Sequence, residues 1–130
     1  MILKLLAPAL ALVALPVPAI GQASVPLPVL SLDQETAVRC GAAFAIVASE
    51  QARGSVLAAK WPALGTRGRE FFVRTGARLM DETGADRPQV QALFARAASG
   101  LRGDPAALPA RLESLRAPCL SLLDLAIPPR

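Results

Sequence analysis

Apolar residues recur every three or four positions in four stretches of the chain, a spacing that places them on one face of an α-helix. The pattern is clearest in residues 87–102, whose apolar positions are Val90, Leu93, Phe94, Ala97, Ala98 and Leu101. Comparable stripes lie in residues 32–53, 67–83 and 109–125. No stretch alternates apolar and polar residues as a half-buried strand does. The pattern therefore predicts an all-α protein with four helices.

Residues that commonly cap helices bound these stretches. Ser31 with Gln34, and likewise Asp86 with Gln89, have the spacing of a capping box, in which two side chains satisfy the first backbone amides. The other expected boundaries are Thr66 and Asp104 at helix starts, and Gly54, Gly84 and Gly103 at helix ends. Pro109 and Pro118 are expected to delay the start of the last helix or to kink it.

Short connections between the predicted helices favour antiparallel packing of neighbours. We therefore expect one domain over residues 31–125, folded as a small four-helix bundle with up-down-up-down topology. Residues 24–30 contain two prolines and no helical period, which indicates an extended lead-in. Residues 126–130 are expected to form a frayed C-terminus. Trp61, in the connector between the first two helices, is expected to anchor that loop by packing.

Residues 1–23 have the pattern of a secretory signal peptide. Lys4 precedes an apolar run, and small residues follow this run up to Ala23. A retained membrane anchor is the alternative, but a spanning helix needs about 20 apolar residues, and this run is shorter and contains prolines. We expect cleavage after Ala23, or after Ala19, and therefore a periplasmic or secreted protein.

Cys40 and Cys119 are the only cysteines, and each lies on the apolar stripe of its helix. In an up-down-up-down bundle the first half of the first helix lies beside the second half of the last helix. An oxidising compartment favours a disulfide between such a pair, whereas thiol-exchange enzymes usually carry their cysteines as C-x-x-C. The sequence thus predicts a structural Cys40–Cys119 disulfide that links these two helices.

The composition removes several kinds of site. The chain contains no histidine, which excludes Ser-His and Cys-His nucleophilic centres and zinc sites built on imidazole. It carries no glycine-rich phosphate loop and no haem-attachment motif. The G-x-x-G at residues 65–68 lacks the strands that flank a nucleic-acid clamp of this type. We therefore expect no cofactor, no metal and no nucleic-acid partner.

The formal net charge is +4, and the second predicted helix carries the clearest group of cations. Arg67, Arg74 and Arg78 fall on one side of this helix, with Arg69 nearby. Such a face is commonly only solvated, and neighbouring glutamates partly neutralise it. Its functional interpretation is a patch that binds an acidic envelope protein or anionic lipid headgroups.

These features favour a non-enzymatic binding or interaction protein of the bacterial envelope. A small enzyme that uses only carboxylates and arginines is one alternative. It would need a polar cleft that gathers Glu50, Glu70 or Asp81 with an arginine. The other alternative is an oligomeric structural subunit, which would expose a large apolar patch as a monomer.

Overall fold

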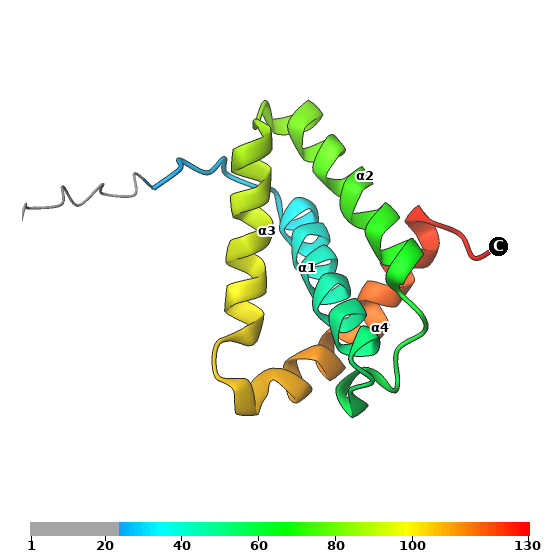
Figure 1. Ribbon diagram of the computed structural model, residues 1–130. Coiled ribbons are helices and arrows are strands. Elements are labelled where there is room, and N and C mark those ends of the chain that lie inside the picture. The colour runs from blue at the N-terminus through cyan, green and yellow to red at the C-terminus, as the bar shows by residue number, and fades with distance from the viewer. Residues whose placement is uncertain (1–23) are drawn as a thin grey trace, which may run out of the picture.

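The computed structural model describes residues 24–130, which contain four α-helices, two short 3-10 helices and no strand (Figure 1). The α-helices are α1 (Leu32–Ala52), α2 (Gly65–Thr83), α3 (Arg87–Arg102) and α4 (Leu108–Ala126). The 3-10 helices η1 (Val56–Ala58) and η2 (Pro105–Ala107) lie in the α1–α2 and α3–α4 connections. The all-α prediction is confirmed for these residues, and the predicted signal peptide lies outside them.

The capping boxes of α1 and α3 form as predicted. Ser31 and Asp86 each accept a hydrogen bond from the backbone amide three residues on, at Gln34 and Gln89. The glutamine side chains in turn accept hydrogen bonds from the backbone amides of the caps. Gly84 ends α2 with a φ of 71°, a left-handed conformation that glycine adopts without steric cost.

Two helix starts differ from the prediction. α2 begins at Gly65, and its N-cap residue is Leu64 instead of Thr66, with no side-chain cap hydrogen bond. Leu64 is fully buried, so tertiary packing directs the chain into α2 and overrides the local capping preference. Asp104 caps η2 instead of α4, and α4 then begins at Leu108, close to the expected start.

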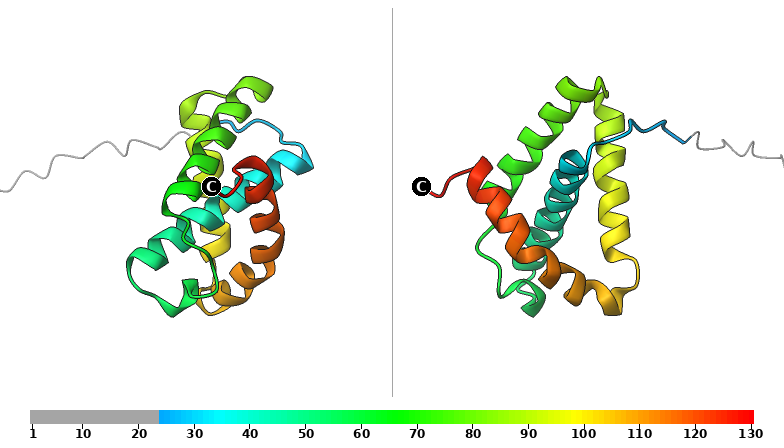
Figure 2. Two further views of the ribbon diagram at one scale, coloured as in Figure 1. Left: turned by 90° about the vertical axis from the view of Figure 1, so that its right-hand side faces the viewer. Right: turned by 180° about the vertical axis from the view of Figure 1, so that it is seen from behind.

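α1 is the central helix and packs against α2, α3 and α4 (Figure 1; Figure 2). The chain alternates in direction through the four helices, but α4 crosses α1 obliquely and does not lie along it (Figure 1). The arrangement therefore establishes an all-helical domain, whereas a regular up-down-up-down bundle is not confirmed by it.

The buried apolar residues form two clusters. At the centre of the larger one, the ring of Phe44 packs edge-on against Trp61 and Phe71. The side chain of Gln51 donates to the carbonyl oxygen of Pro62 at 2.7 Å, beside Trp61. Trp61 therefore anchors the α1–α2 connector as predicted. The smaller cluster joins α1, α2 and α3 through Val38, Leu79, Ala85, Val90, Leu93 and Phe94.

Gly41 allows a close approach of α1 to α3, because a Cβ atom there would lie 2.7 Å from Phe94 Cε1. We expect Gly41→Ala to lower the free energy of unfolding by about 1–3 kcal/mol, the usual cost of overpacking a core. Gly100→Ala in α3 is the matched control, since its Cβ atom would meet nothing within 4 Å. Urea unfolding followed by Trp61 fluorescence measures both, and equal effects would contradict the steric explanation.

The segments on either side of the helices are held against them. The carbonyl oxygen of Pro26 accepts a hydrogen bond of 2.8 Å from Gln89 Nε2 in α3. Leu27 and Leu30 pack against the smaller cluster. After α4, Ile127 is buried. The lead-in thus lies across α1 and α3, where it forms one wall of the pocket described below.

Candidate functional site

The predicted disulfide is present between α1 and α4. Cys40 and Cys119 are joined by an S–S bond of 2.04 Å, with 5.3 Å between their Cα atoms. Both residues are buried, and residues 24–130 contain no free cysteine. A buried bond is hidden from attacking thiolates, as is expected of a structural disulfide.

Arg67, the first of the four predicted binding arginines, links the start of α2 to the end of α4. Its Nη2 atom donates to Asp124 Oδ1 at 2.7 Å and to the carbonyl oxygen of Ile127. Only 26% of its side chain is exposed. The Nε atom is buried without a partner in the described part of the chain. The guanidinium of Arg67 therefore serves mainly to connect α2 to the end of α4.

The other three arginines of this face are exposed, and two are in ion pairs. Arg74 Nη2 lies 2.6 Å from Glu70 Oε1, and Arg78 Nε lies 2.7 Å from Glu82 Oε1. Exposed pairs of this kind stabilise a helix by about 0.2–0.5 kcal/mol each. Arg69 forms no ion pair within residues 24–130. Three of the four predicted arginines, Arg67, Arg74 and Arg78, therefore form ion pairs with nearby carboxylates.

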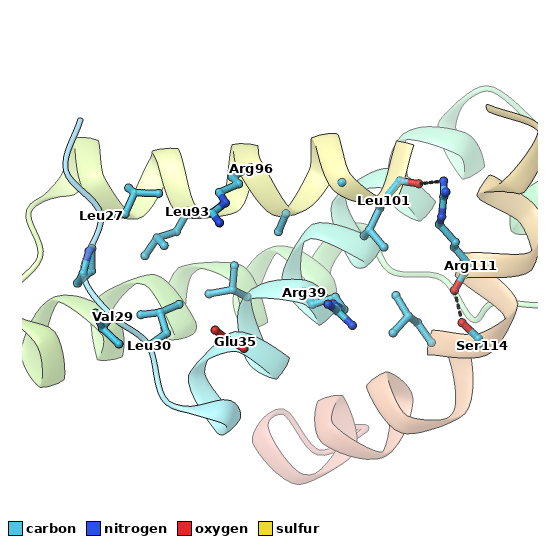
Figure 3. A pocket seen from close by; sticks show the side chains of 15 residues that line it. Leu27, Val29, Leu30, Glu35, Arg39, Leu93, Arg96, Leu101, Arg111 and Ser114 are labelled. Atoms are coloured by element: carbon cyan, nitrogen blue, oxygen red, sulfur yellow. Dashed lines mark hydrogen bonds between the residues drawn. The ribbon is translucent and has the colours of Figure 1, made fainter. Parts of the chain in front are cut away.

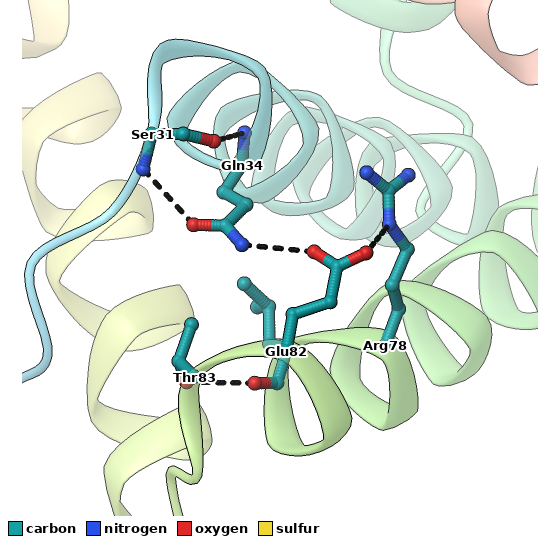
Figure 4. A network of polar contacts seen from close by, with 6 residues as sticks. Ser31, Gln34, Arg78, Glu82 and Thr83 are labelled. Atoms are coloured by element: carbon teal, nitrogen blue, oxygen red, sulfur yellow. Dashed lines mark hydrogen bonds and ion pairs between the residues drawn. The ribbon is translucent and has the colours of Figure 1, made fainter.

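Glu82 connects α2 to the first turn of α1 (Figure 4). Its carboxylate accepts hydrogen bonds from Gln34 Nε2 at 2.8 Å and from Arg78 Nε at 2.7 Å. The hydrogen bond from Gln34, followed by that from Arg78, lowers the pKa of Glu82 below its ordinary value of 4.5. Because Gln34 also belongs to the capping box of α1, one network holds the ends of two helices together.

A pH dependence follows from this lowered pKa. A carboxyl group whose pKa falls on folding stabilises the protein above its unfolded pKa, and this stabilisation is lost as the pH falls through the folded value. The difference in stability between wild type and Glu82→Gln should therefore shrink as the pH drops below 4.5. Urea midpoints across this range measure it. Asp81→Asn is the control, and a similar convergence for that variant would contradict the role of the network.

A pocket of about 760 Å³ lies between the lead-in, α1, α3 and α4. This volume is within the range of about 300–1,000 Å³ that is typical of small-molecule sites. Three cations line it, one from each of three helices: Arg39 of α1, Arg96 of α3 and Arg111 of α4. Glu35 is its only carboxylate. Its main apolar lining consists of Leu27, Leu30, Val38, Leu93, Leu101 and Leu115.

None of the three arginines of this pocket forms an ion pair with a carboxylate, whereas five of the other nine arginines in residues 24–130 do. Arg39 and Arg96 are exposed at the pocket wall. Arg111 Nη1 donates to the carbonyl oxygens of Leu101 and Asp104 at 3.2 and 3.3 Å, at the end of α3. These bonds orient the guanidinium at the C-terminal end of α3, whose carbonyl oxygens offset part of its charge, and no carboxylate pairs with it. The pocket therefore has an excess of positive charge.

Apolar side chains line both ends of the pocket, and two of its three arginines lie toward one end, beside Leu101 (Figure 3). Leu27, Leu30 and Leu93 lie at the end formed by the lead-in, whereas Arg39 and Arg111 lie toward the end formed by α4. Arg96 projects from α3 into the space between them (Figure 3). A ligand with one apolar and one anionic end would match this distribution.

Arg39, Arg96 and Arg111 were not predicted as site residues from the sequence. Each is next in sequence to a residue of an apolar stripe, and this placed each of them at the edge of a helix interface. A position beside an apolar stripe is only weak evidence for a binding site, because the aliphatic stems of arginines commonly pack along the edges of such stripes. The convergence of the three depends on tertiary packing, including the position of the lead-in.

The carboxylates named for the alternative of an enzyme, Glu50, Glu70 and Asp81, do not share a pocket in the described part of the chain. Glu50 pairs with Arg53 near the end of α1, and Glu70 pairs with Arg74 on α2. Neither residue lines the pocket, and Asp81 does not line it either. Residues 24–130 contain no group of three or more potential metal ligands.

No helix within residues 24–130 is long and apolar enough to cross a membrane. Comparisons of the chain with protein-family models, with curated proteins and with solved structures found no match.

Proposed function

We propose that this protein is a small, non-enzymatic binding protein that holds an anionic ligand in the pocket between the lead-in, α1, α3 and α4. The observation that carries the proposal is the convergence of Arg39, Arg96 and Arg111 on one pocket without a carboxylate partner. Five other arginines of the described chain do have such partners. The pocket is therefore a place where an external anion can supply the missing charge.

The chemistry of arginine supports this choice of ligand. A guanidinium presents its N–H donors in a planar fork that matches carboxylate and phosphate oxygens, and such charge-assisted bonds are about twice as strong as neutral ones. Apolar side chains of the pocket lie beside these donors, where they can contact the rest of a bound anion. The α2 face is a weaker candidate for an acidic protein or lipid headgroups, since Arg67, Arg74 and Arg78 already contact carboxylates.

Two further elements of the proposal concern export and topology. The basic start, apolar run and small residues of 1–23 support a cleaved signal peptide, and the disulfide agrees with an oxidising compartment such as the periplasm. The alternating direction of the helices supports an up-down-up-down bundle with an oblique α4 (Figure 1).

Export can be tested on protein isolated from the periplasm or the medium. We expect its N-terminus at Ser24, or at Ile20 if the second cleavage position is used. Intact mass and N-terminal sequencing measure this directly. A chain that retains Met1 in the membrane fraction would overturn the export proposal and would leave the pocket proposal unaffected.

Ligand binding can be tested with anilinonaphthalene sulfonate, an anionic dye that fluoresces in apolar surroundings. We expect it to bind the wild type, and Arg39→Gln/Arg96→Gln to weaken binding by about tenfold or more, which corresponds to about 1.4 kcal/mol. Arg69→Gln/Arg87→Gln, which removes two exposed arginines outside the pocket, is the matched control and should bind as wild type.

A neutral dye of related shape, phenylnaphthylamine, distinguishes recognition of the negative charge from nonspecific apolar binding. Its binding should be unchanged by the Arg39→Gln/Arg96→Gln substitutions. The proposal fails if both dyes lose affinity equally, if neither variant pair affects the anionic dye, or if that dye does not bind.

The alternatives of an enzyme and an oligomeric subunit receive less support. The pocket has one carboxylate, whereas acid–base chemistry without histidine commonly uses a well-placed pair. The exposed large apolar residues of the described chain are distributed over several elements: Val25, Val29, Leu32, Val56, Val73 and Leu125.

A further inference from the structure

We infer that the ligand of this pocket is an amphipathic anion with a single alkyl chain, for which a straight-chain carboxylate is the simplest representative. The inference rests on the proposed function and adds the chemical class of the ligand and its orientation. The chain would lie along Leu27, Leu30 and Leu93, and the anionic group would lie between Arg39 and Arg111.

The first support for this class is the polarity of the pocket. Its lead-in end combines leucines with the one carboxylate, Glu35, while its α4 end carries Arg39 and Arg111 (Figure 3). Glu35 lies one helical turn before Arg39, so its repulsion of an anion is weakest near Arg111, and the charged group of a ligand is directed toward that side. A small polar anion would use the arginines but would leave the leucine end in contact with water.

The second support is the apolar surface that such a chain would cover. Leu27 and Leu30 are only partly buried although they lie against the smaller core cluster. Each methylene that an alkyl chain buries against such surface contributes about 0.8 kcal/mol, or about fourfold in affinity. Arg96 lies between the two ends, and its aliphatic stem can pack along the alkyl chain (Figure 3).

The third support is size. A pocket of about 760 Å³ is within the usual range for ligands of drug size, which suits one alkyl chain with its head group. A lipid with two acyl chains would leave much of its apolar surface outside. The pocket therefore favours a free single-chain anion over a bilayer lipid.

Displacement of the bound dye by a series of straight-chain carboxylates, all below their micelle concentrations, tests this inference. From octanoate to decanoate to dodecanoate, we expect the dissociation constant to fall by about 15-fold at each step of two methylenes. Leu27→Ser/Leu30→Ser should flatten this dependence. These leucines lie outside the helices, and Val56→Ser, at an exposed position outside the pocket, is the matched control.

Two comparisons separate this inference from the proposed function. If octanoate and dodecanoate bind equally, the alkyl chain is not recognised and the inference fails, while binding of an anion at the arginines stands. If dodecyltrimethylammonium, with a cationic head, displaces the dye as well as dodecanoate does, both proposals fail. Loss of the chain-length dependence in Val56→Ser as well as in Leu27→Ser/Leu30→Ser would also overturn the inference.

Discussion

Replacing both Cys40 and Cys119 with alanine is expected to lower the free energy of unfolding by about 4 kcal/mol. The disulfide closes a loop between residues separated by 79 positions. In the chain-entropy model, a loop of this length removes enough freedom from the unfolded chain to stabilise the native state by about 4 to 4.5 kcal/mol. A small domain has a total stability of only about 5–15 kcal/mol, so this loss is a large fraction of the whole.

Urea unfolding of oxidised wild type, reduced wild type and the double alanine variant measures this effect. Trp61, the single tryptophan, is buried and reports the loss of the core, while far-ultraviolet circular dichroism reports the helices. We expect reduction to produce nearly the same destabilisation as the double substitution. Equal stability of the oxidised and reduced forms would contradict a structural role for the disulfide.

The disulfide could be predicted because the chain contains only one possible pair of cysteines and both lie on apolar helix faces. Cys40 and Cys119 are the only two cysteines, and each lies on the apolar stripe of a helix. An apolar stripe faces the core, and antiparallel packing of the first and last helices brings the first half of one beside the second half of the other. Helix boundaries were predictable for a similar reason where local chemistry decides them, as at Ser31 and Asp86.

At the start of α2, the local capping preference of the sequence does not determine the helix boundary. Thr66 is a good N-cap by its side-chain chemistry, but the helix begins at Gly65 after the buried Leu64. Burial of a leucine side chain stabilises by about 1.5–3 kcal/mol, whereas an N-cap contributes about 1 kcal/mol. Burial of Leu64 therefore decides the boundary, and this burial depends on contacts that are distant in sequence.

The candidate site could not be predicted for the same reason. The periodicity correctly placed Arg67, Arg74 and Arg78 on one helix, but Asp124, which neutralises Arg67, lies on α4. Arg39 and Arg96 belong to no motif in the sequence. Their common pocket exists because the lead-in crosses α1 and α3, and neither helical periodicity nor capping describes that crossing.

Phe44→Ala is expected to lower the free energy of unfolding by about 3–5 kcal/mol, the usual cost of truncating a buried phenylalanine. Phe44 is 0% exposed, and its ring centroid lies 5.1 Å from that of Phe71 and 6.3 Å from that of Trp61. Edge-to-face pairs of this kind add about 0.5–1.5 kcal/mol beyond the buried area. Phe72→Ala is the matched control, because Phe72 stacks on Phe94 but is only partly buried.

The native-state fluorescence gives an independent measure of the same substitution. Truncation of Phe44 removes a neighbour of Trp61, so we expect the emission of folded Phe44→Ala to shift, whereas that of Phe72→Ala should not. A larger loss of stability for Phe72→Ala than for Phe44→Ala would show that the smaller cluster, and not the larger one, dominates the fold.

Combining Phe44→Ala with the loss of the disulfide tests whether the two contributions are separate. The disulfide acts chiefly by restricting the unfolded chain, whereas Phe44 acts by filling the native core, so their effects should add. Together they amount to about 7–9 kcal/mol, which reaches the range of total stability expected for a small domain. We therefore expect Phe44→Ala to be folded when oxidised and largely unfolded when reduced, as circular dichroism would show. A reduced Phe44→Ala protein with full helical content would mean that the other contacts of α1 with α2 and α3 suffice to hold the fold.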